Sequence, residues 1–145
     1  MGLDRGFNYH EHTADITVEC WAPSLEEAFA EAGKATFEVI VDTSTVDPSD
    51  CVEVRASGID LKELLVEWVG RLIALIDING QFYSKFKIDE IKKEDSIYSL
   101  LAHVWGEDFD LEKHGTRTEV KAMTYADMRI EQSDERTTFW FTLDL

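Results

Sequence analysis

The stretch DITVECWAPSLEEAFAEAGKATF, residues 15–37, decides the fold because a strand pattern is followed at once by a helix pattern. Apolar and polar residues alternate along residues 15–22, which is the period of a strand with one buried face. Ser24 then stands three residues before Glu27, a spacing typical of a helix N-terminus at which both side chains accept hydrogen bonds from free amides. An apolar stripe at helical spacing follows. We therefore expect a strand and then a helix that ends before the β-branched run at Val39.

A second strand and helix follow a loop-like segment, residues 42–50, that is rich in Asp, Thr and Ser. The alternating residues from Val52 predict a strand that ends near Gly58, and Asp60 with Glu63 repeats the capping pattern. The helix that this cap begins has an apolar face broad enough to cover a sheet. That face consists of Leu61, Leu64, Leu65, Trp68, Leu72, Leu75 and Ile76.

The rest of the chain, beyond a tight-turn signal at Asn79-Gly80, predicts β-structure throughout. The β-branched and aromatic segments are residues 82–88, 97–105, 119–124, 128–131 and 137–143. Two helices cannot cover both faces of so large a sheet. We therefore expect one α+β domain over residues 1–145, with the two main helices packed on one side of a largely antiparallel, curled β-sheet.

Length and charge limit the classes of function. The chain has 145 residues with 44% hydrophobic content, enough for one core and too few for two ordinary domains. Its 14 basic and 30 acidic residues give a formal net charge of −16. Such a chain lacks the long-range attraction to phosphates that dominates nucleic-acid affinity, so we expect no direct strong binding to nucleic acid. It would instead attract a basic protein patch or concentrate cations.

Targeting signals are not evident in the sequence. The start, residues 1–6, lacks the charged and then apolar pattern of a secretory signal, and no apolar run approaches the roughly 20 residues of a membrane span. Two cysteines without such a signal do not indicate a disulfide framework. We expect a cytoplasmic protein with no membrane contact.

Three short motifs carry the candidate chemistry: HTADI at residues 12–16, VKAMTY at residues 120–125, and the last two residues, Asp144 and Leu145. Asp15 and Asp144 each offer a carboxylate, and the C-terminal residue adds a third. Hard oxygen ligands of this kind suit calcium or magnesium. If they converge, two like charges about 4 Å apart repel by ~4 kcal/mol at an effective dielectric near 20, so the cluster needs a cation or raised pKa values.

In their order and spacing, these three motifs resemble the archease family, and the resemblance extends over nearly the full chain. It implies an accessory protein, not itself an enzyme, that activates the tRNA-splicing RNA ligase by promoting guanylylation and multiple turnover of that ligase. It also implies metal ligands at Asp15, Asp144 and Leu145, for a divalent metal that we expect to be Ca²⁺, with Mg²⁺ or Mn²⁺ as alternatives. The guanine nucleotide would bind the ligase, because no phosphate-binding glycine pattern occurs in this chain.

Four further residues lie in the matching motifs, and each has a structural alternative. Lys121 could neutralise the acidic site or touch the ligase, or it could be an outward strand residue paired with a neighbouring glutamate. His12 could contact the partner or hold its own loop by hydrogen bonding. Thr124 and Tyr125 could support the site or pack at a strand end. The chain carries Ala126 where relatives of this family usually have histidine, so no role of that histidine can be carried over.

Two other functions remain open. His10, His12 and Asp15 could be the start of a metal-dependent hydrolase site, although such a site needs more ligands than these three. The chain could also be a chaperone-like scaffolding module that binds through apolar surface. The alternative to any ligand role for Asp15 is that of an ordinary turn or strand-start residue.

Overall fold

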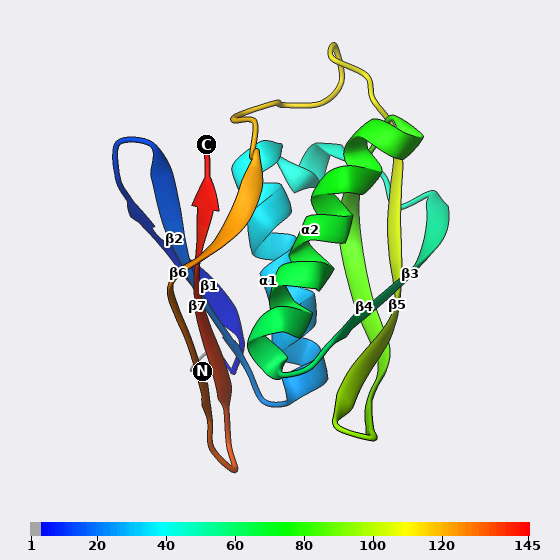
Figure 1. The fold of residues 1–145 in the computed structure, drawn as a ribbon. Coiled ribbons are helices and arrows are strands. Elements are labelled where there is room, and N and C mark those ends of the chain that lie inside the picture. The colour runs from blue at the N-terminus through cyan, green and yellow to red at the C-terminus, as the bar shows by residue number, and fades with distance from the viewer. Residues whose placement is uncertain (1–3) are drawn as a thin grey trace.

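The two helices of the protein lie between two antiparallel sheets, which gives three layers (Figure 1). The structure is a computed structural model that describes residues 4–145. The helices are α1 (Leu25–Ile40) and α2 (Leu61–Asn79), and a short 3-10 helix, η1 (Thr43–Thr45), follows α1. The first sheet has the strand order β1 (Gly6–Glu11), β2 (Asp15–Ala22), β7 (Thr137–Asp144) and β6 (Ala122–Gln132). The second has the order β3 (Asp50–Gly58), β5 (Ile97–Asp108) and β4 (Gln81–Glu94).

The predicted α+β class with two main helices and antiparallel strands is confirmed. The strands form two sheets rather than one curled sheet, and the helices pack against both. The reason is visible in α1, where all six consecutive residues from Ala28 to Gly33 are buried. Six residues cover every side of a helix, so no side of α1 faces water over that length. A single sheet would have left one side of this helix exposed.

Both predicted helix starts are confirmed. The Ser24 hydroxyl accepts a hydrogen bond from the Glu27 amide at 3.1 Å, and the Asp60 carboxylate accepts one from the Glu63 amide at 2.8 Å. These bonds satisfy amides that have no partner within the helix. The second helix ends at Asn79 and is capped by Gly80, whose φ of 62° lies in the left-handed region that glycine adopts without steric cost.

Several element bounds differ from the prediction. α1 continues to Ile40 instead of ending before Val39, and β4 and β5 run to Glu94 and Asp108, beyond the predicted ends at residues 88 and 105. Two strands differ in more than their ends. β1 was not expected, although its alternating burial lets Phe7 and Tyr9 pack against the core. The segments predicted as residues 119–124 and 128–131 belong to one strand, β6, which begins at Ala122. Its pairing with β7 is interrupted between Thr124 and Arg129, and Asp127 there has a φ of 56°. An irregularity of this kind lets one strand change direction without leaving the sheet.

Gly106 marks a close approach between β5 and β4. A Cβ atom at this position would overlap the Phe82 carbonyl oxygen and lie 2.7 Å from the Cα of Tyr83. We expect Gly106→Ala to lower the free energy of unfolding by about 2–3 kcal/mol, because the two strands must move apart to accommodate the methyl group. Urea unfolding followed by circular dichroism measures this change.

The matched control is Gly70→Ala. Gly70 lies inside α2, and nothing would come within 4 Å of an added Cβ atom there. The same chemical change should therefore stabilise the protein by roughly 0.5–1 kcal/mol through helix propensity. Similar effects of the two substitutions would contradict the close approach at Gly106.

Candidate functional site: a carboxylate cluster at the C-terminus

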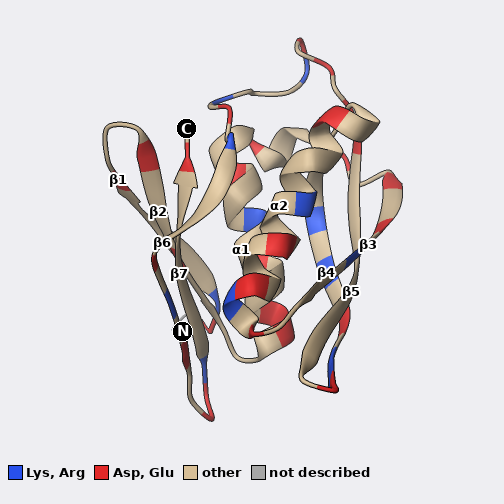
Figure 2. Ribbon diagram, in the orientation of Figure 1, with Lys and Arg blue, Asp and Glu red and all other residues tan. Residues whose placement is uncertain are grey.

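Asp15 and Asp144 lie directly opposite each other at the ends of neighbouring strands. Asp15 begins β2, Asp144 ends β7, and the two residues are partners in the antiparallel register. The adjacent pair, Ile16 and Leu143, is buried against the helices. Because side chains alternate along a strand, both carboxylates are on the outer face of the sheet, within the distance at which opposed side chains interact. Figure 2 shows acidic segments at these strand ends.

The C-terminus is held beside these two residues. The Leu145 amide donates a hydrogen bond to the Ala14 carbonyl at 3.1 Å, so the last residue continues the pairing of β7 with the β1–β2 turn. Leu145 also packs against the core. A terminus that is tied down in this way can present its carboxylate at a defined place, whereas a frayed one cannot. The structure therefore brings together the three positions that the sequence proposed as ligands.

One carboxylate oxygen of Asp15 stands out by its burial and its hydrogen bonding. Oδ1 of Asp15 is buried and has no hydrogen-bond partner among residues 4–145. A buried carboxylate oxygen without a partner is costly, and a bound cation would satisfy it. Within the same residues, no three His, Cys, Asp or Glu side chains gather as a set that could hold a metal ion. A site here would thus need the terminal carboxylate as its third protein donor, and this all-oxygen donor set fits a hard cation.

Two threonines that sequence reasoning did not single out lie next to the carboxylates. Thr17 and Thr142 are opposite each other in the register, and their hydroxyl oxygens are 3.1 Å apart. Each is two residues from Asp15 or Asp144, so the four side chains share the outer face. The period-two spacing in the sequence was the available signal. The hydroxyl pair links β2 to β7 immediately behind the two carboxylates.

Lys121 and His12 lie next to the same site through their backbones. The Lys121 amide donates to the Asp144 carbonyl at 2.8 Å, and the His12 amide donates to the Asp15 carbonyl at 3.0 Å. Both side chains are exposed. Their backbones therefore fix the strand ends that carry the aspartates, and their side chains are free to reach a partner. This arrangement leaves both predicted roles open for each residue.

Thr124 and Tyr125 occupy the interrupted part of β6. The Thr124 hydroxyl accepts a hydrogen bond from the Ala126 amide at 2.8 Å, which supports the local irregularity. Tyr125 is 56% exposed. Partial desolvation, followed by the negative charges of Glu63 and other acidic residues at the start of α2, raises the pKa of Tyr125. Thr124 thus shapes the strand, whereas Tyr125 faces the acidic beginning of α2.

The hydrolase arrangement is not formed. His10 lies 3.4 Å from the Glu19 carboxylate, and its side chain is largely exposed. Among residues 4–145, His10, His12 and Asp15 do not make up a three-ligand set. Strand pairing explains this result, since it directs His10 towards Glu19 on β2.

A separate ionic cluster ties the loop after β5 to the body of the protein. The Glu107 carboxylate lies 2.9 Å from His114 Nε2 and 2.8 Å from Lys113 Nζ. The hydrogen bond from His114 and then that from Lys113 lower the pKa of Glu107 to about 2. Hydrogen bonds to Asp47 and Glu107 raise the pKa of Lys113 to about 12. The cluster therefore holds its charges over the ordinary pH range.

We expect Glu107→Gln to lower the thermal unfolding midpoint at neutral pH. The pKa of Glu107 is lower in the folded protein than its ordinary value of 4.5, so its stabilising effect is fully present above pH 4.5. The effect is lost as the pH falls towards about 2, where the carboxylate is protonated. The difference in midpoint between wild type and variant should therefore shrink across this window. A difference that stays constant down to the acid end would contradict the assignment.

Comparison with known proteins shows the family of this chain. Residues 7–145 match the Archease protein family (MTH1598/TM1083). The chain belongs to the archease family. The protein archease of Aeropyrum pernix is 40% identical over 140 residues, which are 97% of each chain. That of Sulfurisphaera tokodaii is 40% identical over 139 residues, or 96% of this chain and 98% of the relative. The match includes Asp15, Asp144 and Leu145 within the family region.

Solved structures show the same fold. The solution structure of Methanobacterium thermoautotrophicum protein 1598 is 33% identical, with a TM-score of 0.81, and covers 97% of this chain and 99% of its own. The crystal structure of a Thermotoga maritima protein, described as an archease and possible chaperone, is 21% identical with a TM-score of 0.60 and covers 94% of both chains. The three-layer arrangement is therefore common to the archease fold. Among residues 4–145, no helix is long and apolar enough to cross a membrane.

Proposed function

We propose that this protein is an accessory activator of a tRNA-splicing RNA ligase and is not itself an enzyme. The observation that supports a metal-dependent role is the buried, unpaired Oδ1 of Asp15 opposite Asp144. Both carboxylates and that of Leu145 would hold a divalent cation, with Ca²⁺ favoured by the oxygen donors and Mg²⁺ or Mn²⁺ as alternatives. The cation, when bound, would offset the repulsion among the carboxylates and order them.

The residues around the carboxylates would prepare a docking surface. Backbone bonds from His12 and Lys121 hold the two strand ends, and the threonine pair behind them links β2 to β7. The exposed side chains of His12 and Lys121 would contact the ligase beside its active site. Binding there would promote guanylylation of the ligase and allow repeated turnover. The net charge of −16 would steer the protein towards a basic patch, and this attraction would weaken as salt rises.

The proposal is tested by the rate of guanylylation of a cognate ligase with GTP, divalent metal and catalytic amounts of this protein. Wild-type protein should accelerate the reaction. Asp15→Asn keeps the shape of the side chain but removes a ligand charge, so we expect it to reduce the acceleration at least about tenfold. Glu11→Gln, which removes an exposed charge from the neighbouring strand, should have little effect.

The outcomes separate the competing functions. Acceleration by wild type and by Glu11→Gln, but not by Asp15→Asn, would tie activation to the carboxylate site. Equal acceleration by all three would instead favour a scaffolding module that does not need the metal. The absence of acceleration by wild-type protein would exclude the activator role. Turnover of a phosphoester by the protein without a partner would support a hydrolase.

A further inference from the structure

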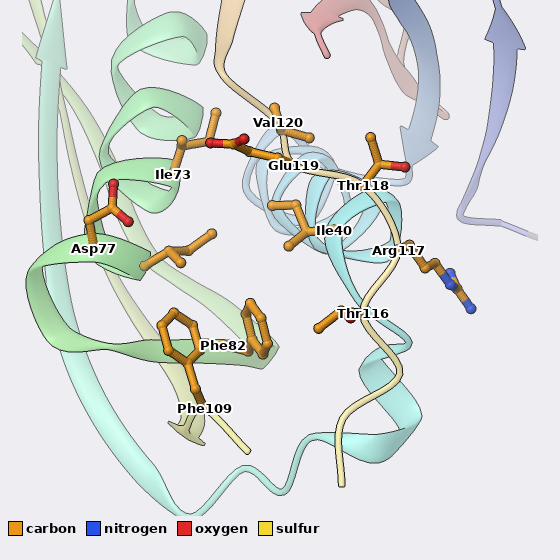
Figure 3. A pocket seen from close by; sticks show the side chains of 11 residues that line it. Ile40, Ile73, Asp77, Phe82, Phe109, Thr116, Arg117, Thr118, Glu119 and Val120 are labelled. Carbon is orange, nitrogen blue, oxygen red and sulfur yellow. The ribbon is translucent and has the colours of Figure 1, made fainter. Parts of the chain in front are cut away.

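A pocket of about 280 Å³ opens at the end of the molecule where both helices finish. Its apolar lining comes from Ile40 at the end of α1, Ile73 and Ile76 near the end of α2, and Phe82, Phe109 and Val120 (Figure 3). The rings of Phe82 and Phe109 lie 4.6 Å apart and form one wall. Phe109 is 43% exposed although it is aromatic. The pocket is therefore an accessible apolar surface outside the carboxylate site.

The charges at this pocket are acidic and unmatched. The exposed carboxylates of Asp77 and Glu119 line it, and neither has a cationic partner within residues 4–145. Arg117 also belongs to the lining, but its side chain points away and binds the Glu38 carbonyl at 2.7 Å. The last turn of α2 contains no basic residue. Its partial negative charge therefore adds to that of the two carboxylates.

The size and chemistry of the pocket select its occupant. At about 280 Å³ it is smaller than most pockets for cofactors or other small molecules, but it has room for one or two large side chains. An apolar side chain would fill the space between Ile76 and Phe109, and an adjacent cation would meet Asp77 and Glu119. Leu111, 77% exposed, extends the apolar surface along the following loop. A purely apolar ligand such as a lipid chain would match the apolar lining but leave the two carboxylates without a partner. An anionic ligand would be repelled by those carboxylates.

The pocket is connected to the carboxylate site through the chain itself. Residues 116–120 form one wall of the pocket and lead directly to Lys121, whose amide binds the Asp144 carbonyl. Figure 1 shows this segment and the C-terminus at the same end of the molecule. A partner anchored in the pocket would thus be held next to Asp144.

We propose that this pocket anchors a segment of the partner protein that presents a large apolar side chain next to a lysine or arginine. The apolar side chain enters between α2 and Phe109, and the basic residue pairs with Asp77 and Glu119. The inference rests on the proposed function in one respect, namely that the partner is the RNA ligase. In this arrangement the pocket supplies affinity, because a desolvated apolar anchor contributes most of the binding energy of an interface. The carboxylate site supplies the activation.

The first test reverses the charge of the pocket with the double variant Asp77→Lys/Glu119→Lys. The concentration of protein that gives half-maximal acceleration of guanylylation should rise at least tenfold, while the rate at saturation should stay unchanged. The control, Asp134→Lys/Glu135→Lys, makes the same change in net charge on the exposed β6–β7 turn at the other end of the molecule. We expect less than a twofold rise for the control. All four substituted side chains are exposed, and unfolding curves would verify that both variants are folded.

The second test places the photo-crosslinking residue p-benzoylphenylalanine at Phe109. Irradiation with purified ligase should produce a crosslink to a peptide that contains a large apolar residue next to a lysine or arginine. The same residue at Ile97, which is 41% exposed at the β4–β5 turn, should crosslink much less. A Phe109 crosslink to a segment without that pattern would overturn the proposed occupant.

The results distinguish failure of the pocket from failure of the proposed function. The two charge-reversal variants could need the same protein concentration for half-maximal acceleration while Asp15→Asn loses acceleration. That result would overturn the anchoring role of the pocket and leave the activator role intact. If wild-type protein neither accelerates guanylylation nor binds the ligase, the activator role is overturned, and the assigned partner with it. A selective effect of the Asp77/Glu119 change on the half-maximal concentration, with an unchanged maximal rate, would establish the pocket as the anchor.

Discussion

A chain that continues beyond Leu145 is expected to lose almost completely the activation of the RNA ligase that we propose for this protein. A C-terminal hexahistidine tag would convert the terminal carboxylate into a peptide carbonyl and remove one charge from the cluster with Asp15 and Asp144. It would also force the chain past the point where the Leu145 amide binds the Ala14 carbonyl. Loss of a charged ligand weakens cation binding by more than the 10- to 100-fold typical of supporting groups. We therefore expect acceleration of guanylylation to fall by at least about 100-fold.

The control for this experiment is the same tag at the N-terminus, with otherwise identical protein. Binding of Ca²⁺, measured by isothermal titration calorimetry without the ligase, gives a second readout of the terminal carboxylate. We expect tight binding for the N-terminally tagged protein and weak or no binding for the C-terminally tagged one. Asp144→Ala should behave like the C-terminal tag. Full activation by both changed proteins would refute a metal site at the C-terminus.

Trp68→Ala should have the largest effect on stability among the substitutions considered. Trp68 lies on α2, is fully buried, and donates a hydrogen bond from Nε1 to the Phe29 carbonyl of α1 at 2.8 Å. Its indole thus fills the space between the two helices in the central layer. Removing a buried Trp typically lowers the free energy of unfolding by about 3–5 kcal/mol, through lost transfer energy and a remaining cavity. A domain with total stability of about 5–15 kcal/mol would be left marginal or partly unfolded.

Urea unfolding would measure the effect of Trp68→Ala, with Trp105→Ala as control. Trp105 is half-buried on the outer face of the second sheet, where Lys85 lies over its ring at 4.6 Å. Removal of this side chain creates no internal cavity, so the free energy of unfolding should fall much less. Equal losses for the two variants would contradict a central role of Trp68 in packing the helices. Tryptophan fluorescence changes in both variants, so circular dichroism is the better probe.

Local structure was well predicted where neighbouring residues determine it. The two helix starts depend on a cap and an acidic residue three positions later, and both were found in the expected places. Strand β2 follows from its own alternation. The start of β6 was placed three residues too early. Its register with β7 begins at Ala122 opposite Asp144, and just before it the amides of Arg117 and Thr118 bond to the end of α1 instead. Strand β1 was missed because its partner, β2, rather than its own pattern, stabilises it.

At the candidate site, too, the sequence indicates the residues but only the tertiary structure brings them together. The motifs marked Asp15, Asp144 and Leu145 in the sequence, but 128 residues separate the two aspartates along the chain (144 − 15 − 1). Only the pairing of β2 with β7 places them opposite each other. The unpaired oxygen of Asp15 and the pocket between α2 and Phe109 have no sequence signature at all. Both depend on what other segments leave uncovered after packing.

The sequence by itself determined the α+β class, the caps of both helices, the acidic charge and the residues that could bind a cation. Local hydrogen bonding and hydrophobic periodicity act over a few residues, and a single chain segment is sufficient to express them. The tertiary structure decided that the strands form two sheets around the helices and that β7 lies between β2 and β6. Those choices depend on burial of both sides of α1 and on pairing between segments far apart in the chain, and such contacts exist only when the whole core forms at once.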